Sequence, residues 1–330
     1  VGQSLPYATP PQITVTARNG TANGLTNAIT RNYAGAYMKL SNAIGTSLNQ
    51  APYDSQDGRY ARFDVLGGAL TPGLNTLALP ATSADPVIGA FTEGVGTLTF
   101  ASGLAMLRST TVPSAPFDAD IALSLNIVDT DGVAYAANPA RFGDTSAGNG
   151  MAFSSGKLMR FGRLRVDNAV GSDKLDLQMG LRIEYWTGSA FAVNSLDSCT
   201  TLIAKNFSLA NHQPGLVGAG AGANMLSPTA GSDGNVAMGG AFVAGIASVT
   251  ILKPNPAATA PGSVDVCLDL DVSPGTGDAT CQAAVPADKR WLQMLRTNPP
   301  GTHTQDPVGR AAFGLYGSQP KNFIYFRENF

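Results

Sequence analysis

Acidic residues at alternate positions on a tight turn are the first candidates for chemistry in this sequence of 330 residues. Asp129 and Asp131 stand on either side of one threonine, and a glycine follows them, so that two carboxylates could offer oxygen ligands to Ca²⁺. An EF-hand needs further oxygen ligands and a later Glu, which Val133 to Tyr135 do not supply. An Asp-Gly hairpin turn between Ile127 and Val133 is favoured over a calcium loop. We expect no cofactor, with calcium at Asp129 and Asp131 as the alternative.

A second acidic row consists of Asp265, Asp269 and Asp271, which alternate with apolar residues. Such a row could line a metal site at a sheet surface. The alternation itself, however, places the three side chains on the solvent face of a strand. The sequence favours this solvent-facing position over a metal site.

The cysteines and histidines fit no local metal-binding spacing. One disulfide and one odd thiol is the simplest arrangement for Cys199, Cys267 and Cys281. Cys267 and Cys281 would close a short loop and are the first choice, although Cys199 with either one stays open. His212 and His303 both lie in stretches rich in Pro, Gly and Asn, which are typical of surface loops. No Gly-x-Ser-x-Gly motif occurs, so we predict no catalytic residues and no enzyme.

Three aromatic residues surround a tight turn at Thr187-Gly188. Tyr185, Trp186 and Phe191 have the composition of a carbohydrate platform, because aromatic faces stack on pyranose rings. The alternative is that the same side chains pack in the core and across neighbouring strands, which the sequence favours.

The elements that must position these residues are strands, because the dominant hydrophobic period is two. The apolar rows are Leu175, Leu177, Met179, Leu181, Ile183 and Tyr185; Ile121, Leu123, Leu125 and Ile127; and Val264, Val266, Leu268, Leu270 and Val272. Asp-Gly and similar turn pairs separate the rows. Only residues 32–45 and 287–296 have weak helical spacing, so we expect at most short turns of helix.

Short strands with frequent turns predict an all-β chain of two or three tandem antiparallel β-sandwich modules, Ig-like or jelly-roll-like, with little helix. A chain of this length exceeds one typical module of about 100–200 residues. Changes in composition near residues 109–116 and 206–222 predict modules at 1–111, 112–205 and 206–330.

The composition describes a folding chain with few charges. Hydrophobic residues make up 44% and charged residues 13%, and the net charge is −2 without a basic stripe. Nucleic acid is therefore not a predicted partner. No apolar run reaches the ~18 residues that a membrane span requires. The segments at residues 12–17 and 322–328 have the pattern of terminal strands, which a chain can exchange with a second copy of itself to form a filament. The alternative, which is slightly favoured, is that both strands complete their own modules.

Residues 161–172 read Phe-Gly-Arg-Leu-Arg-Val-Asp-Asn-Ala-Val-Gly-Ser, residues 182–186 read Arg-Ile-Glu-Tyr-Trp, and residues 194–200 read Asn-Ser-Leu-Asp-Ser-Cys-Thr. These segments resemble the uncharacterised C-terminal domain of the MshQ proteins, which take part in biogenesis of the mannose-sensitive haemagglutinin (MSHA) type IV pilus. Weaker similarities extend over nearly the whole chain.

The resemblance implies a large secreted protein on the surface of Gram-negative bacteria, and it supplies no catalytic residues. We expect a non-enzymatic structural or adhesion module at the cell surface, whose partners are components of a pilus or another surface filament. A carbohydrate-binding surface adhesin with glycan partners is the first alternative, and a secreted hydrolase is the second.

Overall fold

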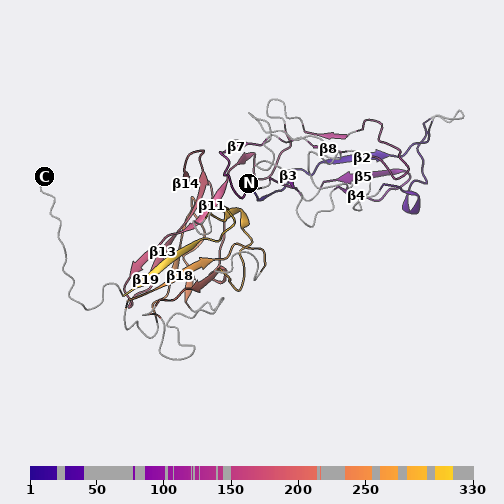
Figure 1. Ribbon diagram of the computed structural model, residues 1–330. Helices are drawn as coiled ribbons and strands as arrows, with labels where there is room; N and C mark the ends of the chain where they lie inside the picture. Colours follow the sequence, from indigo (N-terminus) through magenta and orange to yellow (C-terminus); the bar gives the residue numbers. More distant parts are fainter. Residues whose placement is uncertain are drawn as a thin grey trace. The chain divides into compact units, whose positions relative to one another are not determined.

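The computed structural model describes most of the chain, in two compact units, residues 1–161 and 162–330 (Figure 1). The described residues are 1–20, 27–40, 77–78, 86–100, 103–106, 108–119, 121, 123–125, 127–138, 140–143, 150–213, 216, 235–254, 261–273, 281–295 and 302–314.

The first unit consists of short strands in small sheets around one apolar core. The strands are β1 (Ser4–Leu5), β2 (Gln12–Thr16), β3 (Leu77–Ala78), β4 (Val87–Ile88), β5 (Val95–Thr99), β6 (Leu104–Met106), β7 (Phe117–Asp118), β8 (Leu123–Leu125), β9 (Ala140–Phe142) and β10 (Leu158–Met159). They pair in the orders β1-β6-β3, β2-β5-β4, β10-β7 and β8-β9. Leu98 and Phe100 are fully buried in this core, and Ile13 and Val15 of β2 pack against it, as their alternation predicts.

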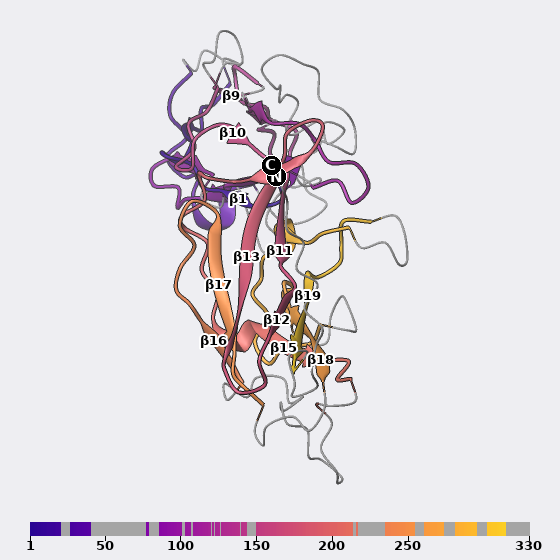
Figure 2. The same cartoon turned by 90° about the vertical axis from the view of Figure 1, so that its left-hand side faces the viewer.

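The second unit is a two-layered β-sandwich. Its strands are β11 (Gly162–Val166), β12 (Ala169–Gly171), β13 (Leu177–Trp186), β14 (Phe191–Val193), β15 (Phe207–Ala210), β16 (Val236–Met238), β17 (Ile246–Ile251), β18 (Gly262–Leu268) and β19 (Val308–Phe313). One sheet has the order β11-β13-β17-β16, with β14 also paired to β13, and the other has the order β12-β19-β18-β15. Figure 2 shows the layer of β13, β17 and β16 beside the layer of β19 and β18.

Side chains from both layers share one core, which explains why the two sheets stay together. Leu177, Met179, Leu181 and Ile183 of β13 are buried against Val264, Val266 and Leu268 of β18 and their neighbours. The all-β prediction is therefore confirmed, and the described pairs are antiparallel except for β12 with β19, which is parallel. Leu175 and Val272, at the ends of the predicted rows, lie outside the strands and are exposed.

Helix is limited to single turns in the described residues. These are 3-10 turns at η2 (Gly35–Tyr37), η4 (Ala204–Asn206) and η5 (Arg290–Leu292), and two of them fall in the stretches where short helical turns were predicted. None of the helices in the described part of the chain has the length and apolar character to cross a membrane.

The two units differ from the three modules predicted at 1–111, 112–205 and 206–330. Six residues of β13 pair with β17, so that the predicted central and C-terminal modules share a single sheet. Tyr7 bridges to Phe153, and their rings stack with centroids 5.5 Å apart, across the boundary predicted at 111/112. Sequence composition misplaces the boundaries because a loop within a sandwich is as rich in Gly and Pro as a linker between domains.

A charge on the inward face of β13 should destabilise the second unit. Leu181→Asp places a charge at a fully buried position, and we expect it to lower the free energy of unfolding by about 3 kcal/mol or more. Gln178→Asp adds the same charge to the exposed face of the same strand and should cost less than about 1 kcal/mol. Urea unfolding followed by tryptophan fluorescence measures both, and equal losses would contradict the assignment of the two faces.

Candidate functional site

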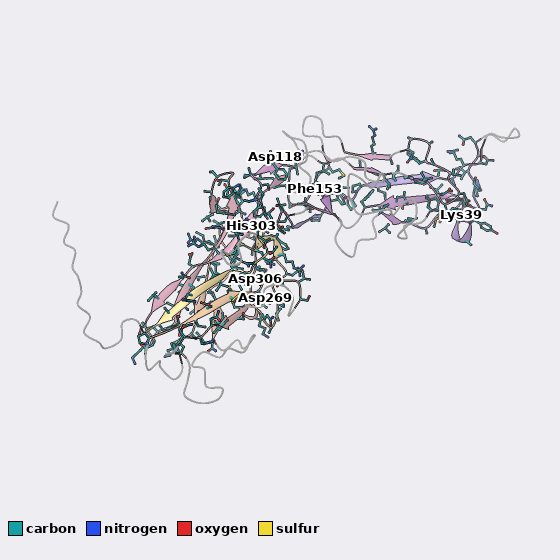
Figure 3. All side chains as sticks on the ribbon, in the orientation of Figure 1. Lys39, Asp118, Phe153, Asp269, His303 and Asp306 are labelled. Atoms are coloured by element: carbon teal, nitrogen blue, oxygen red, sulfur yellow. A yellow bond between two sulfur atoms is a disulfide. The ribbon has the colours of Figure 1, made fainter. Side chains whose placement is uncertain are left out.

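Three buried carboxylates meet beyond the end of β18. Asp269 and Asp271 follow that strand in the chain, and Asp306 precedes β19, which pairs with β18. One carboxylate oxygen of each lies within 4.8 Å of the others, and the three residues are 1%, 2% and 0% exposed. Figure 3 shows Asp269 and Asp306 close together in the second unit.

The predicted solvent-facing position of Asp265, Asp269 and Asp271 is wrong, because both faces of the strand are covered. The backbone that follows Cys281 runs alongside the end of β18. In this segment, the N–H of Ala287 donates to the carbonyl of Asp269 and the N–H of Asp288 donates to the carbonyl of Asp271, both at 2.9 Å. This segment covers Asp269 and Asp271, and Asp265 is also buried.

Asp269 is satisfied by backbone donors. Its Oδ1 accepts a hydrogen bond from the N–H of Asp271 at 3.0 Å, and its Oδ2 accepts one from the N–H of Ala283 at 2.9 Å. The second bond ties the segment after Cys281 to the end of β18. Asp269 is therefore one of the side chains that hold this segment in place, together with Asn206, which donates to the carbonyl of Val285.

Asp271 and Asp306 share one donor, the side-chain amide of Gln293. That amide donates to Oδ1 of Asp271 at 3.2 Å and to Oδ1 of Asp306 at 3.0 Å. Oδ1 of Asp306 also accepts from the N–H of Leu270 at 3.2 Å, and Arg290 Nε lies 3.4 Å from Oδ1 of Asp271. Both second oxygens, Oδ2 of Asp271 and Oδ2 of Asp306, are buried without a hydrogen-bond partner.

Burial favours the protonated forms of Asp306 and Asp269. Burial raises the pKa of Asp306 to about 7, and the neighbouring carboxylates of Asp271 and Asp269 add to this rise, while hydrogen bonds from Gln293 and Leu270 oppose it. Burial also raises the pKa of Asp269. Within the described part of the chain, the cation that pairs with the cluster is Arg290, whose side chain is 52% exposed. An arrangement of three carboxylates and one solvated guanidinium is suited to binding a cation or a proton.

A disulfide also joins β18 to the segment that follows Cys281. Cys267 and Cys281 are bonded, with Cα atoms 5.0 Å apart, as the short loop predicts. Cys199 is an exposed free thiol, so the alternative pairings that involve it are wrong. The segment therefore begins at the disulfide. Two residues later, the N–H of Ala283 donates its hydrogen bond to Asp269.

The third member of the predicted acidic row, Asp265, has a different environment. Its Oδ1 accepts from Arg310 Nε at 2.8 Å, and its Oδ2 accepts from the Asn211 amide at 2.9 Å. Both of its oxygens are thus partnered, and Asp265 is not a member of the cluster.

The acidic turn at residues 129–132 is a hairpin. Val128 bridges to Ala134, and Gly132 has a φ of 81°, which glycine adopts without strain. Asp129 Oδ1 accepts from the N–H groups of Asp131 and Val133 at 3.0 and 2.9 Å, and its Oδ2 accepts from Tyr33 Oη at 3.3 Å. Asp129 therefore holds the turn with Oδ1 and binds Tyr33 with Oδ2.

The aromatic residues at the turn after β13 are half-buried, and two of them pack on each other. Trp186 and Phe191 are cross-strand partners with ring centroids 5.2 Å apart. The guanidinium of Arg163 lies 3.7 Å from the Phe191 ring centroid and forms an ion pair with Glu184 at 2.6 Å. These contacts show the predicted cross-strand packing, and a carbohydrate platform of Tyr185, Trp186 and Phe191 stays a prediction.

His303 is not in a surface loop as predicted. It is 4% exposed, and its ring centroid lies 6.3 Å from that of Phe191. His212 is half-buried next to Asn211, which binds Asp265. The Pro and Gly content around His303 predicted exposure, whereas the chain there turns inward to bring Asp306 to the cluster.

Sequence reasoning identified Asp269 and Asp271 but missed Asp306, Gln293 and Arg290. Asp306 binds the N–H of Leu270, which lies 36 residues earlier in the chain. No local spacing contains such a contact. One local feature could have indicated Asp306, because this acid stands directly before Pro307 and the final strand. Adjacent strands bring their ends together at such a position.

Two models of one protein family match this sequence. The model described as the third domain of DUF6701 matches residues 1–152, and the model described as its fourth domain matches residues 160–329. These stretches correspond to the two structural units. No curated protein and no solved structure matches the chain.

The disulfide generates a prediction for stability. Cys267→Ala combined with Cys281→Ala opens a loop whose ends are 14 residues apart, and we expect the free energy of unfolding to fall by about 3 kcal/mol. Cys199→Ala is the matched control and should leave stability unchanged, because this thiol is exposed and free. Urea unfolding gives the free energy of unfolding of the unmodified chain, the double variant and the control. Equal stability of the double variant and the control would refute the structural role of the disulfide.

The raised pKa of Asp306 predicts a pH dependence in a buffer that contains a chelating agent. The folded chain holds a proton at Asp306 up to about pH 7, whereas the unfolded chain loses it near the ordinary value of 3.8. Stability from this group is therefore complete below about pH 4 and is lost as the pH rises through 7. Asp306→Asn keeps the shape and removes the titration, so its urea midpoint should change less between pH 4 and 8. Parallel profiles for the two proteins would contradict the assignment.

Proposed function

This chain belongs to the DUF6701 family, and from that premise we propose that it is a non-enzymatic structural and adhesion-presenting part of a bacterial surface protein. The family itself has no assigned activity. The proposal therefore rests on the physical properties of the two domains.

The observation that carries the proposal is the buried Cys267–Cys281 disulfide within an all-β chain. Disulfides form and persist in oxidising compartments and are rare in the cytosol, where thiols are kept reduced. Its two cysteines lie in the core of the second unit rather than at an exposed position where a redox switch would act. The disulfide supports a location outside the cytoplasm.

Successive domains of one family support a modular role. The chain contains the third and fourth domains of a numbered series, and the second unit is a sandwich of the kind that many cell-surface proteins use. A series of β-domains can hold a functional region away from a membrane. We therefore propose that these domains are part of the shaft of a larger surface protein.

The partner that we propose is a pilus of the MSHA type or another surface filament, as the resemblance to MshQ implies. Self-assembly is an additional route. Among the described strands, β2 pairs with β5 alone, so its other edge could accept a strand from a second copy. Residues 322–328, the second predicted terminal strand, lie outside the described residues.

Immunogold microscopy tests this function. Antibodies against the purified chain should label intact cells that make the parent protein, at filaments or on the outer surface. Mutants that cannot assemble the filament should lose the filament label. A signal that appears only after the cells are permeabilised would overturn the proposal, and antibodies absorbed with the purified chain are the control.

A further inference from the structure

We propose that Asp269, Asp271 and Asp306 bind a divalent cation, and that this cation is Ca²⁺. The proposal does not depend on the filament or on the surface location. It concerns a ligand of the second unit itself.

The spacing of the oxygens fits one shared ion. Ca²⁺ binds oxygen at about 2.3–2.6 Å, so two ligands on opposite sides of it lie about 4.6–5.2 Å apart. The three carboxylates each place an oxygen within 4.8 Å of the other two. No large rearrangement is needed for all three to reach one ion.

Two buried oxygens need a partner that the protein does not supply. Oδ2 of Asp271 and Oδ2 of Asp306 accept no hydrogen bond, and their residues are 2% and 0% exposed. An unpartnered oxygen of a buried carboxylate loses its hydration without compensation, and a cation replaces that hydration directly. Their Oδ1 atoms are already held by Gln293, which leaves both carboxylates oriented before any ion binds.

The charges of the site also favour a cation. Three carboxylates carry up to three negative charges, and among the described residues only Arg290 forms an ion pair with them, with Nε 3.4 Å from Oδ1 of Asp271. That guanidinium is half exposed and does not reach the unpartnered oxygens. By contrast, both oxygens of Asp265, within β18, accept hydrogen bonds from Arg310 and Asn211.

The chemistry of the ligands favours Ca²⁺ over other ions. All the candidate ligands are oxygens, whereas Zn²⁺ prefers nitrogen and sulfur, and the two nearby cysteines are used in the disulfide. Mg²⁺ requires near-ideal octahedral geometry at 2.0–2.1 Å and keeps several waters, which a buried site with preset carboxylates accommodates poorly. Ca²⁺ accepts irregular oxygen shells.

Thermal unfolding of the whole chain tests the proposal, with tryptophan fluorescence as the readout. Trp186 and Trp291 are the two tryptophans of the sequence, and both lie in the second unit, so this signal reports on that unit alone. After treatment with a chelator, CaCl₂ should raise the Tm by about 5–10 °C when its concentration is about 100 times the Kd. MgCl₂ at the same concentration should raise it by less than half as much.

Matched variants separate ligands from other buried acids. Asp306→Asn and Asp271→Asn should fold in chelator and lose the Tm rise with CaCl₂, because each replaces an unpartnered carboxylate oxygen. Asp265→Asn is the control, and it should keep the full rise, because Asp265 lies outside the cluster and its charge is paired with Arg310. No rise in the unmodified chain, or a full rise in Asp306→Asn, would overturn the proposal.

A second measurement covers the case in which a variant does not fold. Tb³⁺ occupies oxygen sites of Ca²⁺ and emits when a nearby tryptophan is excited. Trp291 adjoins Arg290, which contacts Asp271, so the unmodified chain should show sensitised Tb³⁺ emission that CaCl₂ displaces. Trp291→Phe should lose this emission, and Trp186→Phe should keep it. Emission that CaCl₂ does not displace would reject a specific calcium site.

Discussion

The end of the second unit is organised by one constraint, which is that β18 is buried on both faces. Val264, Val266 and Leu268 face the core between the two sheets. The residues between and after them are equally buried, although several carry carboxylates. Burying a charge without a partner costs several kcal/mol of folding free energy. Each of these carboxylates therefore needs its own hydrogen-bond or ionic partner.

The partners of the buried residues differ along β18, and together these contacts hold the segment after Cys281 in position. Asp265 is matched by the cation of Arg310, Cys267 is bonded to Cys281, and Asp269 accepts two backbone N–H groups. Residues 287–289 then donate backbone hydrogen bonds to the carbonyls of residues 269–271. This segment has only a single helical turn, yet its position is fixed by polar contacts to the strand beside it.

The sequence predicted the features that depend on local patterns. Alternation identified the inward row of β13, the short loop identified the disulfide, and weak helical spacing identified two single turns. The prediction of a solvent-facing acidic row at β18 was wrong. Alternating polar and apolar residues give the same pattern whether the polar face meets water or a covering segment. Asp306 was missed for a related reason, since its contact with Leu270 depends on how distant strands pair. The module boundaries failed because β13 and β17 are separated by three other strands in the chain.

The disulfide and the proposed calcium site act on the same part of the molecule, and both require conditions found outside the cytoplasm. A disulfide between Cys267 and Cys281 needs an oxidising compartment, and calcium sites of extracellular modules are occupied at about 10⁻⁴–10⁻³ M Ca²⁺. In a reducing compartment the segment after Cys281 would lack the covalent bond, and without an ion the Oδ2 atoms of Asp271 and Asp306 would stay buried without a partner. The backbone hydrogen bonds of residues 287–289 would remain. The disulfide and the proposed ion would therefore both be present only in an oxidising compartment that contains calcium, which is the kind of compartment that the proposed function requires.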